Sequence, residues 1–222
     1  MTIHVLVEGA SELALLDRWA PRLLRQRGVR IHPHQGKGEL PVDPKAVPEG
    51  KRRGLLDQLP AKLRGFAKAS QSKTHQVVVL VDADNDDQGD LVARISKVAG
   101  QVAPGLSVTV TLAVEETEAF YLGDLRSLKR AFPDADMDKA RAYVPDSICG
   151  TWELFGVIVH DGGGNKVAWA EAMGPVLTVK ARESRSPSFK KFVKDLLALV
   201  PARDPVRKRG LSKIARKLAS RR

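Results

Sequence analysis

The chain has almost no cysteine and no long hydrophobic run, and each absence excludes a class of protein. Cys149 is the single cysteine among 222 residues, which excludes a disulfide framework and a zinc site built from thiolates. No run approaches the ~20 consecutive apolar residues that a helix needs to cross a bilayer. The first apolar segment reaches Glu8 without the basic start and long apolar centre of a signal peptide. We therefore expect a cytoplasmic protein with no membrane partner.

Positive charge is in excess, and most of it lies at one end of the chain. The formal net charge is +11, and residues 203–222 hold nine Lys or Arg against one Asp, so the rest of the chain is nearly neutral. Release of counterions favours the binding of such a tail to a phosphate backbone, so we expect nucleic acid, in the first place DNA, as a partner. A solvated tail without a function is the alternative. The candidate nucleic-acid-binding residues are Arg207, Lys208, Arg209, Lys213, Arg216 and Lys217.

The most informative segment is 76–87, with the sequence Q-V-V-V-L-V-D-A-D-N-D-D. Its five consecutive apolar residues cannot alternate between core and solvent, which predicts a strand buried on both faces of a parallel sheet. Asp82 and Asp84 follow at the end of this strand. In an extended chain, side chains two residues apart leave on the same side, so these two could share one Mg²⁺ or Mn²⁺. A solvated acidic turn that merely ends the strand is the alternative.

Two further strand-like segments also run into carboxylates. Residues 3–7 lead into Glu8, and residues 108–114 lead into a segment that contains Glu116 and Glu118. Neighbouring parallel strands end at the same edge of a sheet, so we expect Glu8 near the aspartates, as a metal ligand or as an acid/base. Glu116 and Glu118 could help to hold a second ion. Acids that only stabilise the start of a following helix are the alternative.

Two lysines beside glycines are candidates for binding phosphate. Lys37 lies between Gly36 and Gly38, and Lys166 follows a run of three glycines and Asn165. Glycine allows the backbone and the ammonium group to approach a phosphate closely. The Lys37 segment is not a P-loop, because the glycine spacing and the Ser/Thr after the lysine are missing. A flexible surface loop is the alternative for Lys166.

The order of the segments predicts an α/β fold. Strand-like and helix-like stretches alternate through residues 1–124, which favours a core with a mostly parallel four-stranded sheet flanked by helices. Residues 125–202 are typical of a helical C-terminal extension that packs on this core, and residues 203–222 form the basic tail. Within the extension, Ser186 as N-cap and Pro187 at the first position predict the start of a helix.

These motifs resemble a known fold. V-L-V-E-G-A-S-E and V-V-V-L-V-D-A-D-N-D-D are similar to the two signature elements of the TOPRIM (topoisomerase-primase) fold, a glutamate after the first strand and an Asp-x-Asp after a later one. The resemblance is closer still to a TOPRIM-like group of small bacterial proteins, domain-of-unknown-function family 4276. It extends over roughly residues 3–200 and includes Gly36-Lys37, the acidic segment 116–124 and the Ser-x-Ser-Phe of 186–189. Two departures are Phe120, where tryptophan is expected, and Glu115, where a basic residue is usual.

The resemblance implies a reaction class and a partner. TOPRIM proteins include nucleases, primases and topoisomerases, and this chain has no tyrosine in a topoisomerase setting and is small for the other machinery. The resemblance therefore implies a Mg²⁺- or Mn²⁺-dependent nuclease in which Glu8, Asp82 and Asp84 are catalytic. By analogy with overcoming-lysogenisation-defect nucleases, it also implies an AAA-type ATPase partner and a role in defence against phage or foreign DNA.

Two other functions stay open at this point. The first is a non-catalytic TOPRIM-like subunit that binds an ATPase and uses its tail to hold nucleic acid. The second is a phosphatase similar to the haloacid dehalogenases, in which the first aspartate of an Asp-x-Asp attacks phosphate. Here that motif follows a later strand, and Asn85 stands where threonine or valine is expected.

Overall fold

The computed structural model describes residues 2–25, 28–69, 75–147 and 150–200. The predicted basic tail, residues 203–222, lies outside the described residues together with its six candidate nucleic-acid-binding side chains. Nucleic-acid binding by the tail therefore stays a prediction.

The centre of the fold is a sheet of four strands that all run parallel, in the order β2-β1-β3-β4. The apolar run 77–81 lies in β3, an inner strand that is covered on both faces, which is why its side chains need not alternate. The predicted α/β class with a four-stranded parallel sheet is confirmed. The strands are β1 (Thr2–Val7), β2 (Gly28–Pro33), β3 (His75–Asp82) and β4 (Ser107–Ala113).

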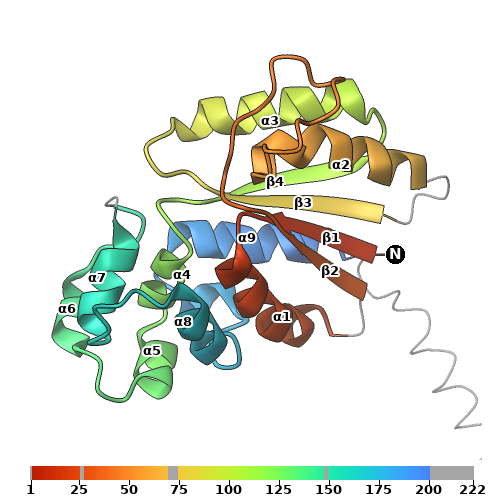
Figure 1. Cartoon of the computed structure of the whole chain (residues 1–222). Helices are drawn as coiled ribbons and strands as arrows, with labels where there is room; N and C mark the ends of the chain where they lie inside the picture. Colours follow the sequence, from red (N-terminus) through yellow and green to blue (C-terminus); the bar gives the residue numbers. More distant parts are fainter. Residues whose placement is uncertain (1, 26–27, 70–74, 148–149, 201–222) are drawn as a thin grey trace, which may run out of the picture.

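Helices cover both faces of the sheet (Figure 1). One face carries α2 (Leu55–Ala69) and α3 (Gln88–Val102), and the other carries α1 (Ala10–Leu24) and α9 (Pro187–Ala198). Neighbouring side chains of β3 point to opposite faces, so this strand contributes to both hydrophobic cores. The two cores hold the strands in register and thereby fix the positions of the residues that follow them.

Helix α9 brings a segment far along the chain back to the first helix. Trp19 of α1 packs against Phe189 and Phe192 of α9, with ring centroids 5.6 and 5.7 Å apart. The side chain of Ser186 accepts a hydrogen bond from the backbone N–H of Phe189, and Pro187 occupies the first turn, as predicted. The C-terminal segment therefore completes the core on this face of the sheet.

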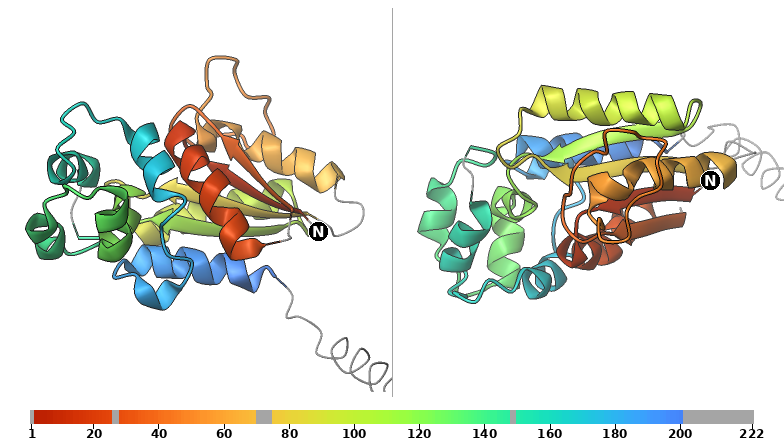
Figure 2. Two further views of the ribbon diagram at one scale, coloured as in Figure 1. Left: turned by 90° about the horizontal axis from the view of Figure 1, so that it is seen from below. Right: turned by 45° about the horizontal axis from the view of Figure 1, so that its top comes forward.

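The remaining helices gather beyond the carboxyl ends of the strands (Figures 1 and 2). Of these, α8 packs on α1, and α4 packs on α9 and α7. Within the described residues, none of the helices is both long and apolar enough to span a membrane. The predicted helical C-terminal part is confirmed. Its helices are α5 (Leu125–Ala131), α6 (Met137–Ala142), α7 (Thr151–Ile158), α8 (Lys166–Met173), η1 (Ala181–Glu183) and α9, and α4 (Glu118–Gly123) precedes them.

Candidate metal centre

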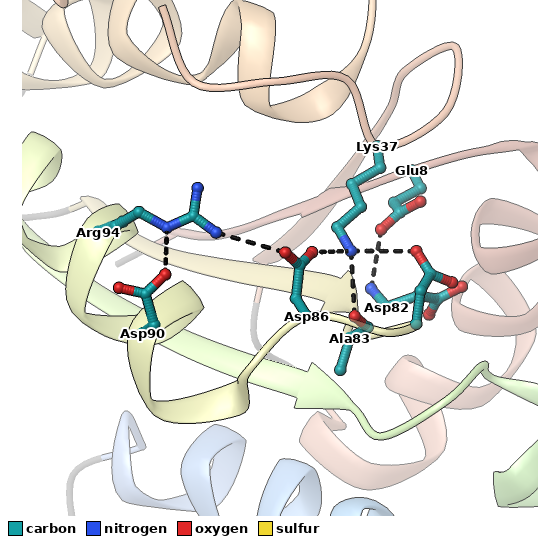
Figure 3. Close-up of polar contacts among 8 residues, drawn as sticks. Glu8, Lys37, Asp82, Ala83, Asp86, Asp90 and Arg94 are labelled. Atoms are coloured by element: carbon teal, nitrogen blue, oxygen red, sulfur yellow. Dashed lines mark hydrogen bonds and ion pairs between the residues drawn. The ribbon is translucent and has the colours of Figure 1, made fainter. Parts of the chain in front are cut away.

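The first two candidate residues meet at the carboxyl edge of the sheet. Glu8 directly follows β1, and Asp82 is the last residue of the neighbouring strand β3. The backbone N–H of Asp82 donates a hydrogen bond of 2.8 Å to Glu8 Oε1 (Figure 3). The parallel pairing of the two strands thus brings these side chains together, as the sequence predicts.

Two further carboxylates lie close to this pair. Glu12, in the first turn of α1, and Glu118, the first residue of α4, are both buried. The hydroxyl of Thr117 donates to Glu12 Oε1 at 3.2 Å and links the starts of the two helices. Burial raises the pKa of Asp82 well above its usual range, and the charges of Glu8, Glu12 and Glu118 raise it further. We call these four residues the acidic centre.

Burial favours the protonated form of two residues of the acidic centre, Glu8 and Glu118. Burial raises the pKa of Glu8 to about 7, and the charges of Asp84 and Glu12 raise it as well. The hydrogen bond from the Asp82 N–H has the opposite effect and lowers it. Burial likewise raises the pKa of Glu118 to about 7, where the charge of Lys166 opposes the shift. These carboxylates lack enough positive charge around them, which is the condition that a bound cation relieves.

Two buried oxygens in this region have unmet hydrogen-bonding capacity. Glu118 Oε1 and the hydroxyl of Tyr121 have no hydrogen-bond partner among the described residues. Burial raises the pKa of Tyr121, and the nearby charges of Glu118, Glu12 and Asp82 raise it further. Buried polar atoms are nearly always satisfied, so an unpartnered carboxylate oxygen in a cluster of acids suits a hard, oxygen-binding cation.

The carboxylates of the described residues are nevertheless not arranged around a single metal position. Across the described residues, no three His, Cys, Asp or Glu side chains stand together in the arrangement of a formed metal site. One reason is the position of Asp84, which the sequence predicts to share an ion with Asp82. The strand ends at Asp82, and Asp84 has a φ of 47°, so the expectation of an extended chain here is wrong.

Asp84 instead turns towards Lys37. Lys37 Nζ lies 3.0 Å from Asp84 Oδ2 and 2.6 Å from Asp86 Oδ2, and it also donates to the carbonyl of Ala83 at 3.2 Å (Figure 3). Arg94 of α3 extends this charged row with a 3.4 Å contact to Asp86. Lys37 therefore ties the loop after β2 to the turn after β3, and contact with phosphate stays a prediction for it.

The second candidate lysine lies near Glu118 and Asp82 of the acidic centre. Lys166 Nζ donates to Glu116 Oε1 at 3.1 Å and lies 5.1 Å from the ring centre of Trp152. Glu116 Oε2 accepts the backbone N–H of Trp152 at 2.8 Å, so both oxygens of Glu116 already have partners. Burial lowers the pKa of Lys166, but Glu118, Glu116 and Asp82 raise it by more. The side chain of Lys166 therefore stays positively charged beside the acidic centre.

The chain matches, over residues 7–197, the family model described as Domain of unknown function (DUF4276). The chain belongs to this family. The DUF4276 match contains the acidic centre, Lys37 and Lys166 and ends within α9, so it leaves the basic tail outside. No curated protein and no solved structure matches the chain.

Two further candidate residues, one in the acidic centre and one beside it, are not predicted from the sequence. Glu12 stands four residues after Glu8, in the first turn of α1, and its carboxylate accepts a hydrogen bond from the Thr117 hydroxyl. Tyr121 stands three residues after Glu118 on α4, and this spacing puts both on one side of a helix. The spacings were visible, whereas the burial that makes them significant was not.

A histidine cluster lies elsewhere on the sheet. His4 of β1 makes hydrogen bonds with His32 of β2 at 3.0 Å and with His75 of β3 at 2.8 Å, and Phe66 of α2 packs on its ring. Both ring nitrogens of His4 are used by its neighbours, so they cannot converge on one ion. Burial lowers the pKa of His4 to about 4, with His32 and His75 acting in the same direction.

Proposed function

We propose that this member of DUF4276 is a nuclease that hydrolyses phosphodiester bonds with the help of Mg²⁺ or Mn²⁺. The observation that carries the proposal is the acidic centre itself, in which the buried Glu12 and Glu118 lie beside the partly buried Glu8 and Asp82, and Glu118 has an oxygen without a hydrogen-bond partner among the described residues. Such a cluster is unfavourable without a cation, and its all-oxygen donor set suits Mg²⁺ and Mn²⁺. The resemblance of the strand-end motifs to TOPRIM nucleases supports the same chemistry.

The residues that would hold the ion are Glu8, Asp82 and Glu118, with Glu12 beside them. When bound, the ion would neutralise these carboxylates and polarise the phosphodiester that is attacked. Asp84 binds Lys37 through Oδ2, so we propose that it contributes through its remaining oxygen. Glu116 has a different main role in this proposal, because its two oxygens fix Lys166 and the start of α7.

The remaining side chains of the centre would position substrate and handle protons. Glu8 Oε1 is held by the Asp82 N–H, which leaves Oε2 to take up or release a proton. The pKa of about 7 for Glu8 belongs to the metal-free centre, and a bound cation would lower it. Lys166 would attract the scissile phosphate towards the carboxylates, which by themselves repel it. The hydroxyl of Tyr121 would donate a hydrogen bond within the loaded centre.

The substrate and the partner are part of the same proposal. The basic tail would hold the phosphate backbone of DNA without reading its sequence. An AAA-type ATPase would be the partner, in defence against phage or foreign DNA, as the resemblance to overcoming-lysogenisation-defect nucleases implies.

A second function has one observation in its favour. Lys37 already compensates Asp84, and Lys166 already compensates Glu116, so two of the expected metal ligands have cationic partners in the protein itself. A non-catalytic subunit that binds nucleic acid and an ATPase would need no further cation at these two positions.

A cleavage assay separates the two functions. Purified full-length protein is incubated with supercoiled plasmid in Mn²⁺ or in chelator, beside Asp82→Asn and the control Asp134→Asn. Asp134 is exposed and makes no ion pair within the described residues. We expect nicking by the wild type and the control in Mn²⁺ only, and none by Asp82→Asn. Equal nicking by Asp82→Asn, or none by any protein, would contradict the nuclease.

A further inference from the structure

A group of basic side chains on α5 and α6 has no role in the function proposed above. Arg126, Lys129 and Arg130 are exposed, and Lys129 and Arg130 stand three and four residues after Arg126, so both lie on the same side of α5 as Arg126. This face borders a shallow depression with a volume of about 520 Å³. We call it the basic depression. Its lining residues are Leu125, Arg126, Lys129, Arg130, Met137 and Arg141.

Little negative charge compensates this face. In the part of the chain that the structure describes, Arg126 and Arg130 make no ion pair, and Lys129 donates to the carbonyl of Pro133 rather than to a carboxylate. Of the four cations only Arg141 has an acidic partner, Asp138, at 2.6 Å. The depression therefore carries a concentrated positive charge.

Asp124, the nearest acid before α5, cannot compensate this charge from the surface. It is buried, and its carboxylate accepts the backbone N–H groups of Ser127 and Thr178. It acts as the N-cap of α5 and as an anchor for the segment before η1.

The stability of the helix does not account for the arrangement. Lys129 and Arg130 lie in the last turn of α5, where the macrodipole favours cations, but Arg126 lies in the first turn, where it disfavours them. Arg130 also lies close to Arg22 of α1, whose pKa is lowered by burial and by the charge of Arg130. Like charges at this spacing destabilise an isolated helix. A bound anion would therefore relieve a repulsion that remains in the folded protein.

The basic depression stands next to the elements that build the metal centre. Helix α5 packs against α4, which begins with Glu118, and against α8, which begins with Lys166 (Figure 1). A long polyanion that reaches the acidic centre can therefore run on over α5. A single small anion has no such reason to occupy both places.

We propose that the basic depression binds the phosphate backbone of the nucleic acid whose phosphodiester lies at the acidic centre. This inference rests on the proposed function, because it takes nucleic acid as the ligand. Arg126 and Arg130 contact phosphates and position the strand, and they read no bases. The acidic centre gains from this arrangement, because its own charge repels the backbone and binding energy has to come from a neighbouring surface.

Salt-dependent DNA binding tests the proposal. The double variant Arg126→Glu/Arg130→Glu is compared with Lys97→Glu/Lys194→Glu, which makes the same change in net charge at exposed positions on α3 and α9 that have no ion pair in the described chain. The affinity of each full-length protein for a fluorescent 30-base-pair duplex is measured by anisotropy in chelator, over a range of NaCl concentrations. Circular dichroism melting confirms that both variants are folded.

The expected result is specific to the position of the charges. Arg126→Glu/Arg130→Glu binds about tenfold more weakly than the control variant, and the slope of log affinity against log salt falls by about 2, one for each lost phosphate contact. Equal affinity and equal slope in the two variants would overturn the proposal. Unchanged DNA binding with a loss of binding to phosphatidylglycerol vesicles would also overturn it, in favour of a lipid surface.

A small substrate keeps the two proposals distinguishable. Hydrolysis of bis(p-nitrophenyl) phosphate in Mn²⁺ needs the acidic centre. The substrate itself is too small to reach the basic depression as well. Both double variants are expected to hydrolyse it at the wild-type rate. If the wild type fails to hydrolyse it and fails to nick plasmid, the nuclease is wrong, and the anisotropy comparison still decides whether the basic depression binds nucleic acid.

Discussion

Glu8 and Asp82 are joined by a hydrogen bond from the Asp82 backbone N–H to Glu8 Oε1, although 74 positions separate them in the sequence. The bond connects the ends of β1 and β3 at the edge where the acidic centre forms. It also distinguishes the two oxygens of Glu8, since Oε1 accepts the backbone N–H and Oε2 does not. Substitutions at Glu8 can therefore separate structure from chemistry.

Glu8→Gln is expected to fold normally and to lose nuclease activity. The amide oxygen of glutamine can still accept the Asp82 N–H, but the side chain can neither bind a cation as a carboxylate nor take up a proton. Glu8→Ala leaves that N–H without its partner and is expected to cost about 1–3 kcal/mol of unfolding free energy in addition. Urea unfolding of both variants at pH 7 measures the difference, and equal stability of the two would show that the bond contributes little.

Mn²⁺ is expected to raise the melting temperature of the wild-type protein. A ligand that binds only the folded state at one hundred times its dissociation constant stabilises it by about 2.7 kcal/mol. Asp82→Asn should lose this shift, whereas Asp134→Asn should keep it. Thermal melting with and without excess chelator provides the measurement. A shift of the same size in Asp82→Asn would place the ion somewhere other than the acidic centre.

Glu118→Gln is expected to stabilise the metal-free protein at pH 8. The pKa of Glu118 is about 7 in the folded protein and near 4.5 when unfolded, so the folded state binds more protons between these values. The wild type therefore loses stability as the pH rises from about 4.5 to 7, by on the order of 1–3 kcal/mol, and the variant does not. The check is the difference in unfolding free energy in chelator, which should be largest at pH 8 and small at pH 4.

The histidine cluster is expected to make the protein less stable in acid. The pKa of His4 is about 4 when folded, against 6.5 for a free histidine, so the unfolded state binds more protons between these values. Stability is lost as the pH falls from about 6.5 to 4, by on the order of 1–3 kcal/mol for His4. His4→Gln should flatten this part of the stability profile, while His160→Gln at an exposed position should not. Parallel profiles for the wild type and His4→Gln would contradict the assignment.

Much of the scaffold is encoded in local patterns. The apolar run of β3 specifies a strand that is covered on both faces, and Ser186 with Pro187 specifies the start of α9. Parallel strands end at one edge, so the nearness of Glu8 and Asp82 also follows from the order of segments. Membership of DUF4276 agrees with the motifs at these positions.

The sequence alone determined the sheet, its acidic edge and the family, because each depends on periodicity or on residues a few positions apart. Only the tertiary structure decided which acids form the centre. It turned Asp84 towards Lys37 through a backbone conformation with positive φ, and it brought Glu12 to Thr117 across 105 positions of sequence. The physical reason is that burial and charge depend on neighbours in space, and no local pattern specifies those neighbours.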